Sequence, residues 1–257
     1  LAGNVRDIFE DREGNIWFAT DQGSQQYDGY RWTTYKTEDG LAHNRVRTVY
    51  QTRDGAMWFG TYGGGISRFD PGSEQVWTTY TTEDGLTGNT IWWRGLHQTR
   101  DGTLWVGFFS WGDTTGTQAG ISRFDGRQWR SYTVRDGLPE GRNLGSVWQI
   151  ADGTIWAGGS NGTLCRLEGD RWKAYTSEEI PHLGGDLNVL QSQDGSTWFW
   201  SWGQQKAFRF QGASRKWMSF APPDPLFEGY PASDGSVWFG TQSGALRRGQ
   251  LAQVYPR

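Results

Sequence analysis

The sequence is poor in the residues that most often build disulfide frameworks and metal centres. Its 257 residues include one cysteine, Cys165, so an internal disulfide framework and a cysteine-rich metal site are both excluded. The three histidines show neither His-x-x-x-His nor His-x-Glu spacing, and no Gly-x-Ser-x-Gly motif or phosphate-binding glycine loop occurs. We therefore expect no cofactor and no metal, and we assign no catalytic residue.

Long apolar runs and clusters of one charge are also missing. No segment approaches the roughly 20 apolar residues of a membrane-spanning helix, so we expect no direct membrane insertion of this chain. The net charge is −3 and the basic residues are scattered, which argues against nucleic acid as a partner. Glycine and tryptophan are abundant instead, with 38 and 17 residues, and this balance favours many short strands joined by tight turns.

A Gly-x-x-Trp motif recurs six times along the chain. Its copies begin at Gly14, Gly55, Gly102, Gly153, Gly195 and Gly235. Five of these glycines follow an aspartate, and Asp-Gly between two β-like runs predicts a tight hairpin. Two further β-like runs follow each hairpin, which gives four short strands per unit, named a to d here. Such a repeat predicts an all-β fold, a six-bladed β-propeller with four antiparallel strands per blade.

The blades are expected to follow one another without interruption. We predict a single propeller domain over residues 1–257, with blades at about 1–40, 41–85, 86–137, 138–180, 181–222 and 223–257. Each blade would be contiguous in sequence. The ring would then close without a strand shared between the first and last blades.

Blades one to three match one repeat best, and blade two serves as the example. It reads Asp39-Gly40-Leu41, then Asn44, then Asp54-Gly55-Ala56-Met57-Trp58-Phe59-Gly60-Thr61, then Gly65-Ile66-Ser67-Arg68-Phe69-Asp70. This pattern resembles the two-component regulator propeller repeat of the extracytoplasmic sensor regions of bacterial hybrid histidine kinases, and more distantly the streptogramin lyases. The Asp-Gly-Leu segment is the linker that leads into each blade. Blades five and six depart from the pattern, with Ile180-Pro181-His182-Leu183 and Pro222-Pro223-Asp224-Pro225 in place of this linker. The resemblance implies ligand sensing outside the cytoplasm, periplasmic or secreted, beside adjoining signalling domains.

Most tryptophans are expected to be structural. Six belong to strand b and five to strand d, and Trp148 aligns with large residues of strand a, so we predict that all twelve pack in the core. The other five lie at the linker end of strand a or in the loop between strands b and c, and we expect both regions to emerge on the same face of the ring. These five are Trp92, Trp93, Trp111, Trp200 and Trp202. With Phe109 they predict an aromatic patch that stacks on sugar rings or other planar groups. Alternatively, the longer loops fold back and cover their own tryptophans.

Arginine repeats at one position of strand a. Arg6, Arg47 and Arg94 each lie eight residues before a hairpin glycine, so three consecutive blades present a guanidinium group at equivalent sites. They could bind a carboxylate or sulfate through paired N–H bonds, with Arg142 as a fourth member. Alternatively, they pair with Asp7, Glu10 or Glu228, or line a water-filled channel.

Together these features predict a binding or sensing domain with its site on one loop face. The candidate ligand-binding residues are Trp92, Trp93, Arg94, Phe109, Trp111, Arg142, Trp200, Trp202, Arg6 and Arg47. The expected ligand is a small molecule or oligosaccharide, carbohydrate-like or planar and anionic. Two other classes stay open, a lectin-like or protein-binding scaffold and a lyase-type propeller enzyme whose first candidate base is His182.

Overall fold

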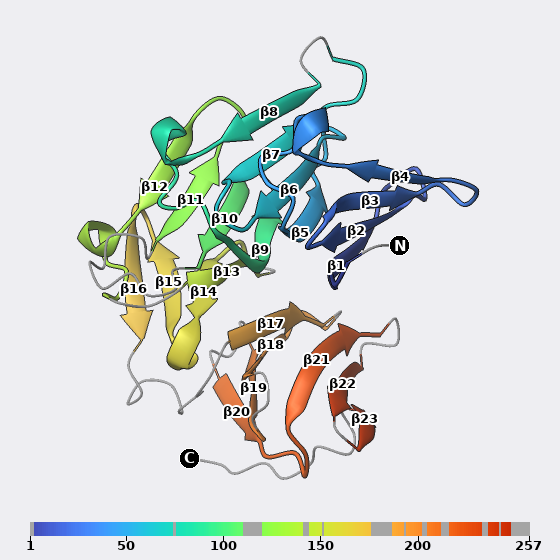
Figure 1. The fold of residues 1–257 in the computed structure, drawn as a ribbon. Helices are drawn as coiled ribbons and strands as arrows, with labels where there is room; N and C mark the ends of the chain where they lie inside the picture. Colours follow the sequence, from blue (N-terminus) through green and yellow to red (C-terminus); the bar gives the residue numbers. More distant parts are fainter. Residues whose placement is uncertain are drawn as a thin grey trace. The chain divides into compact units, whose positions relative to one another are not determined.

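The computed structural model divides the chain into two compact units, Leu1–Val147 and Trp148–Arg257, which we describe separately. The described residues are 3–73, 76–109, 120–140, 144–150, 152–175, 187–192, 194–201, 205–211, 216–232, 236–241 and 243–247. Short antiparallel strands dominate both units (Figure 1). No helix among the described residues is long and apolar enough to cross a membrane.

The N-terminal unit contains three successive four-stranded sets. The first is β1 (Val5–Glu10), β2 (Ile16–Thr20), β3 (Gly23–Tyr27) and β4 (Trp32–Tyr35). The second is β5 (Val46–Gln51), β6 (Met57–Thr61), β7 (Ile66–Phe69) and β8 (Trp77–Tyr80). The third is β9 (Ile91–Gln98), β10 (Leu104–Phe108), β11 (Ile121–Phe124) and β12 (Trp129–Tyr132). The pairing of Phe108 with Leu144 also joins β10 to β13 (Leu144–Gln149), which runs across the division between the units.

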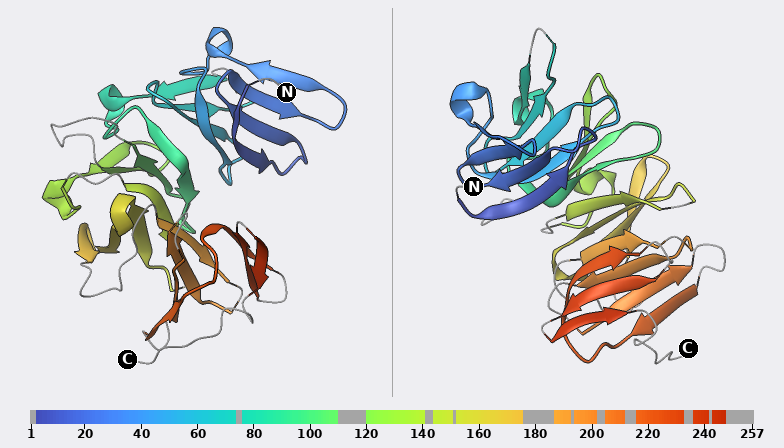
Figure 2. Two further views of the ribbon diagram at one scale, coloured as in Figure 1. Left: turned by 60° about the horizontal axis from the view of Figure 1, so that its bottom comes forward. Right: turned by 90° about the vertical axis from the view of Figure 1, so that its right-hand side faces the viewer.

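The C-terminal unit repeats the same pattern. After β13 come β14 (Ile155–Gly159), β15 (Leu164–Glu168) and β16 (Arg171–Tyr175). The next set is β17 (Leu187–Gln191), β18 (Thr197–Ser201), β19 (Ala207–Gln211) and β20 (Lys216–Phe220). The last set has three described strands, β21 (Leu226–Pro231), β22 (Val237–Thr241) and β23 (Gly244–Arg247). Figure 2 shows β17–β20 and β21–β23 as neighbouring sheets.

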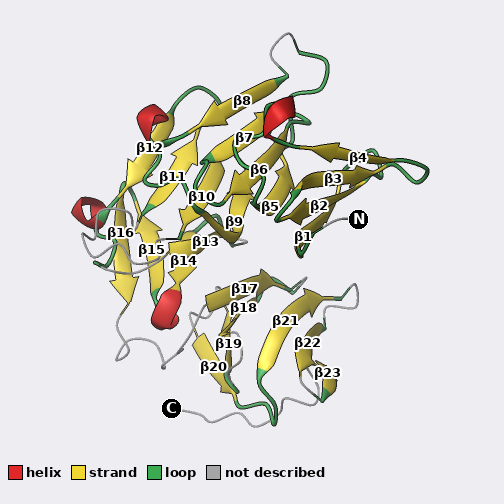
Figure 3. Cartoon of the chain, in the orientation of Figure 1, coloured by secondary structure: helices red, strands yellow, loops and turns green. Residues whose placement is uncertain are grey.

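The sequence positions of the hairpins and linkers are as predicted. Gly55 has φ +94° and its amide donates to the Thr52 carbonyl at 2.9 Å, which closes the turn between strands a and b. The linkers form single turns of 3₁₀ helix, drawn red in Figure 3: η1 (Thr37–Asp39), η2 (Thr82–Asp84) and η3 (Val134–Asp136). A fourth turn, η4 (Ser160–Gly162), follows β14. Buried Leu41 follows η1 and anchors the start of the second set in the core.

The strand-b tryptophans pack between successive sheets, as expected. The ring of Trp17 lies 5.4 Å from that of Phe59 in the next set, and Trp58 lies 5.7 Å from Phe124. Trp105, Trp156 and Trp198 are equally buried, and Trp148 packs against a core cluster. The ring contacts of Trp17 and Trp58 hold neighbouring sheets of the N-terminal unit together.

Two core predictions are wrong. Trp32 is 45% exposed and Trp238 is 36% exposed, although both occupy repeat positions predicted to be buried. Trp32 belongs to the first set and Trp238 to the last, and each of these sets has a neighbour in chain order on one side only. Repeat position alone therefore does not bury a tryptophan, because a second sheet must cover it.

Candidate functional site

The repeated arginines occupy β-bulges, which explains where their side chains point. In β1, Val5 pairs with Thr20 and Asp7 with Ala19, so Arg6 is an extra residue without a cross-strand partner. The same shift in β5 leaves Arg47 as the extra residue. A bulge bends the strand and redirects a side chain. In β5 it leaves Arg47 half-buried between the buried neighbours Val46 and Thr48, and in β1 it leaves Arg6 exposed.

The third set has a larger irregularity at the equivalent place. Ile91 pairs with Phe108 and Leu96 with Val106, so residues 92–95 stand opposite Gly107 alone. This segment contains Trp92, Trp93 and Arg94. The insertion moves Trp93 to the surface, where it is 51% exposed, beside the bulges of the neighbouring strands.

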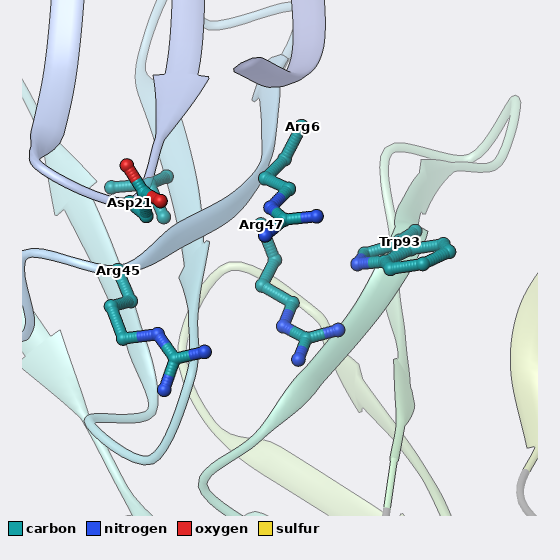
Figure 4. A pocket seen from close by; sticks show the side chains of 6 residues that line it. Arg6, Asp21, Arg45, Arg47 and Trp93 are labelled. Atoms are coloured by element: carbon teal, nitrogen blue, oxygen red, sulfur yellow. The ribbon is translucent and has the colours of Figure 1, made fainter. Parts of the chain in front are cut away.

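These irregular strand starts create a pocket within the N-terminal unit. It has a volume of about 240 Å³ and is lined by Arg6, Asp21, Arg45, Val46, Arg47 and Trp93. Figure 4 shows the guanidinium groups of Arg45 and Arg47 extending in the same direction, with Trp93 beside Arg47. The structure thus brings together three of the predicted site residues, Arg6, Arg47 and Trp93, from three successive sets of strands.

The arginines of this pocket have no acidic partner among the described residues. No described carboxylate lies within ion-pair distance of Arg6, Arg45 or Arg47. Asp7, one of the partners considered from the sequence, instead accepts hydrogen bonds from Thr48 Oγ1 at 2.8 Å and from the Val49 amide at 3.2 Å. The guanidinium groups therefore remain available for an external anion.

The one carboxylate of the pocket, Asp21, forms its hydrogen bonds with Asn4, and the charge of Arg6 also acts on it. Asp21 accepts the Asn4 amide at Oδ1 and Asn4 Nδ2 at Oδ2, both at 2.9 Å, and these bonds lower its pKa, so it stays ionised. Burial lowers the pKa of Arg47, and the like charges of Arg45 and Arg6 act in the same direction. Arginine nevertheless remains protonated at any physiological pH, so the pocket keeps its positive charge.

Arg45 and Tyr62 belong to the site but were missed by sequence reasoning. The Tyr62 amide donates to the Arg45 carbonyl at 2.9 Å, and the Arg45 Cζ atom lies 4.2 Å from the centre of the Tyr62 ring. The positions equivalent to Arg45 in blades one and three are Asn4 and Trp92, so no repeat marks it. Arg45 also precedes the first residue of β5, so strand alternation gives no signal for it.

One predicted site residue lies in the wrong place. Trp200 was expected in a loop, but it is in β18, is 2% exposed, and donates from Nε1 to the Phe227 carbonyl at 3.1 Å. Its ring lies 5.3 Å from Phe239, and a Cβ on Gly229 would clash with it. Trp200 is two residues after Trp198 and shares its face of the strand, so it belongs to the core.

The remaining candidates divide into two groups. Trp92 is half-buried, with its ring 5.0 Å from that of Phe109, and it lies against Gly145, so both rings pack on the protein at the site's edge. Trp111, Arg142, Trp202 and His182 lie outside the described residues, and so does the side chain of Arg94. Within the described parts of the chain, no three His, Cys, Asp or Glu side chains gather as metal ligands would.

Comparison with solved structures shows a shared fold. The chain aligns with the extracellular domain of BT3049 from B. thetaiotaomicron, described as a hybrid two component system, with a TM-score of 0.72 and 21% identity over 96% of this chain and 34% of that one. The corresponding domain of BT4673 from the same organism gives a TM-score of 0.76 and 18% identity over 99% and 36%. This chain therefore spans about a third of the length of these domains.

An enzyme shares the same architecture. A catalytically inactive virginiamycin B lyase from Staphylococcus aureus, solved with quinupristin, aligns with a TM-score of 0.73 and 18% identity over 98% of this chain and 84% of the lyase. At these identities the likeness shows the fold alone. A search of curated protein sequences finds no match to this chain.

The strand sets and these alignments define the chain as an all-β propeller, as predicted. Six blades within a single domain over residues 1–257 stay a prediction. Residues 1–22 and 40–63 match the model of the two component regulator propeller family. These two segments match repeats of this family, which confirms the resemblance noted in the sequence.

Proposed function

We propose that this chain is the ligand-binding part of an extracytoplasmic bacterial sensor, and that its ligand is anionic. One observation carries the proposal: Arg6, Arg45 and Arg47 converge on one pocket, and no described carboxylate pairs with them. Leaving three cations unpaired costs free energy through mutual repulsion, so a fold that holds them together is suited to an external anion. Charge-assisted hydrogen bonds from guanidinium groups fit carboxylate, sulfate and phosphate.

The sensor role is supported by the family and by the likeness to extracellular domains of two component systems. In such an arrangement, adjoining signalling domains would receive the binding signal. We assign no enzymatic activity, because the matching family model is that of the regulator propeller, and likeness to the lyase at 18% identity extends to the fold only.

A binding screen tests the proposal. Oligosaccharides that carry uronic acid or sulfate groups would be titrated against the purified chain with tryptophan fluorescence and thermal shift, beside neutral oligosaccharides of the same length. We expect acidic ligands to bind and neutral ones to bind at least tenfold more weakly, since hydrogen bonds to charged groups contribute about 1.5–3 kcal/mol. Ligand binding that is equal for acidic and neutral sugars would contradict the proposal.

Matched variants locate the site. Arg47→Ala should weaken binding of an acidic hit about tenfold or more, for the same reason. Arg127→Ala is the control, because Arg127 is an exposed arginine of a turn far along the sequence and makes no ion pair among the described residues. Unchanged affinity in Arg47→Ala would place the site elsewhere, and no response to any ligand would favour a protein-binding scaffold.

A further inference from the structure

The guanidinium group of Arg47 is surrounded by aromatic rings. Its Cζ atom lies 4.6 Å from the centre of the Tyr62 ring, 5.5 Å from that of Trp93 and 5.7 Å from that of Phe109. All three distances are within the range of cation–π attraction, about 6 Å. The rings come from two strand ends and one strand bulge, so they hold Arg47 from several sides.

This arrangement changes the role expected of the aromatic patch. From the sequence, Trp93 and Phe109 are ligand platforms, but in the structure both contact Arg47, and Phe109 also contacts Trp92. A ring that already faces a guanidinium group offers less free surface to a sugar. Holding Arg47 in one orientation, in contrast, prepares its planar set of donors for an anion, because less side-chain freedom is lost on binding.

The charges and size of the pocket narrow the ligand further. Three guanidinium groups and the single carboxylate of Asp21 give a net charge of 3 − 1 = +2 among the lining residues. The volume of about 240 Å³ lies below the roughly 300–1,000 Å³ of pockets for drug-sized ligands. Both features fit a small group that carries two negative charges.

We propose that the pocket binds a doubly charged oxoanion group, an inference that rests on the proposed function. In this arrangement Trp93 is a positioning residue that acts through Arg47 and does not stack on the ligand. The charged group can be a free ion or the end of a longer molecule. Arg47 then donates to the oxoanion together with Arg6 or Arg45, while Tyr62 orients Arg45 and Arg47 at once.

Sulfate is the probe that separates these roles, because it carries two charges and has no ring. We expect sodium sulfate to bind more tightly than sodium methyl sulfate by at least fivefold at matched ionic strength, measured by calorimetry and thermal shift. Arg47→Ala should weaken sulfate binding about tenfold. Trp93→Leu should weaken it about threefold or more, although sulfate offers nothing to stack on, and it should change affinity less than twofold in the Arg47→Ala background.

The outcomes distinguish the two proposals. If Trp93→Leu leaves sulfate affinity unchanged but weakens binding of a uronic acid, Trp93 is a stacking platform, and this inference is wrong while the proposed function stands. Equal affinity for sulfate and methyl sulfate would overturn the requirement for two charges. If no anion of either kind binds, both proposals fail. Tyr62→Leu provides a second test of positioning should Trp93→Leu unfold, with Arg127→Ala as the control for both.

Discussion

Arg209 shows how a single charged residue supports its own four-stranded sheet. It is buried, its Nε donates to Ser196 Oγ at 2.8 Å, and its Nη2 donates to Asp194 Oδ2 at 2.7 Å. Its Cζ atom also lies 5.8 Å from the ring centre of Trp198. Arg68 makes the corresponding contacts with Asp54 and Trp58 in the second set. The arginine of strand c therefore joins the a-to-b hairpin to the strand-b tryptophan.

Replacing Arg209 by methionine should be clearly destabilising. The apolar chain remains, but Ser196 and Asp194 lose their charged partner, and we expect a loss of about 2–3 kcal/mol in the free energy of unfolding, since Asp194 stays partly open to solvent. Urea unfolding of the variant and of Arg127→Met measures the difference. A loss in Arg209→Met no greater than that in the control would show that these bonds contribute no stability.

His97 makes stability depend on pH. Burial lowers its pKa from 6.5 to about 4, with a smaller contribution from the charge of Arg53. The unfolded chain therefore takes up the proton first as the pH falls, so the contribution of neutral His97 is complete above about pH 6.5 and is lost progressively toward pH 4. At pH 5 the loss in the free energy of unfolding amounts to roughly 2 kcal/mol, from ~1.4 kcal/mol per pH unit.

Substitution by phenylalanine, the residue at the equivalent position 9, should remove this dependence. Urea unfolding at pH 7 and pH 5 should show a smaller difference in His97→Phe than in the parent chain. The same pH difference in both proteins would mean that His97 is not the group responsible.

At the scale of elements, the tight turns depend on their glycines for two separable reasons. Gly40 ends η1 with φ +116°, and a Cβ there would lie 2.6 Å from the Trp77 ring. Gly55 has φ +94° in a hairpin, and a Cβ there would meet nothing within 4 Å. Gly55→Ala should cost only the left-handed backbone penalty, about 1–2 kcal/mol. Gly40→Ala should cost about 1–3 kcal/mol more, because Trp77 must move.

Thermal or urea unfolding of the two alanine variants compares them directly. The difference between Gly40→Ala and Gly55→Ala isolates the contact with Trp77 from the backbone effect. Equal losses of stability would show that the linker turn can shift away from the tryptophan at little cost.

The elements marked by a repeated motif could be predicted from the sequence, and the irregularities of strand pairing could not. The hairpin at Asp54-Gly55 and the buried Trp58 recur in register, so their structure follows from the repeat. The bulges at Arg6 and Arg47 depend on a shift in cross-strand pairing that leaves no mark in composition. Spacing from the hairpin glycine did identify these arginines as equivalent, but only the pairing explains why they leave the core and converge.

The sequence was least informative about tryptophans outside the repeat, because an inserted residue and a substituted one cannot be told apart by residue type. Trp93 and Trp200 are both tryptophans outside the repeat, yet one lies in a bulged segment at the surface and the other in a regular strand. Trp200 replaces the glycine found at position 60 of blade two, and it fits only because Gly229 leaves room for its ring. Such compensation across sheets has no local signal.

At the scale of the molecule, arginines also fasten successive sheets of the N-terminal unit. Arg12 donates to the carbonyls of Arg53 and Thr52 at 2.8 and 3.2 Å, and Arg53 donates to the Arg100 carbonyl at 2.8 Å. The hairpins of the first and second sets are thus each hydrogen-bonded to the hairpin of the next set. These contacts add to the aromatic packing between neighbouring sheets.

Removing one of these links should weaken the unit without altering the binding pocket. Arg53→Ala loses one bond to a backbone carbonyl, and we expect a loss of about 1 kcal/mol and a Tm lower by roughly 2–4 °C. Differential scanning calorimetry measures the shift, and the affinity for an acidic ligand should not change. A Tm equal to that of the parent chain would show that the bond from Arg53 to the Arg100 carbonyl contributes no stability.

The central claim is that Arg6, Arg45 and Arg47 form an anion site. A crystal structure of the chain, grown without sulfate and soaked in selenate, tests this most directly through the anomalous signal of selenium. The account predicts a selenium peak in the pocket, with selenate oxygens about 3 Å from the guanidinium nitrogens of Arg47 and of Arg6 or Arg45. An empty pocket in which these arginines pair with carboxylates of the chain would contradict it.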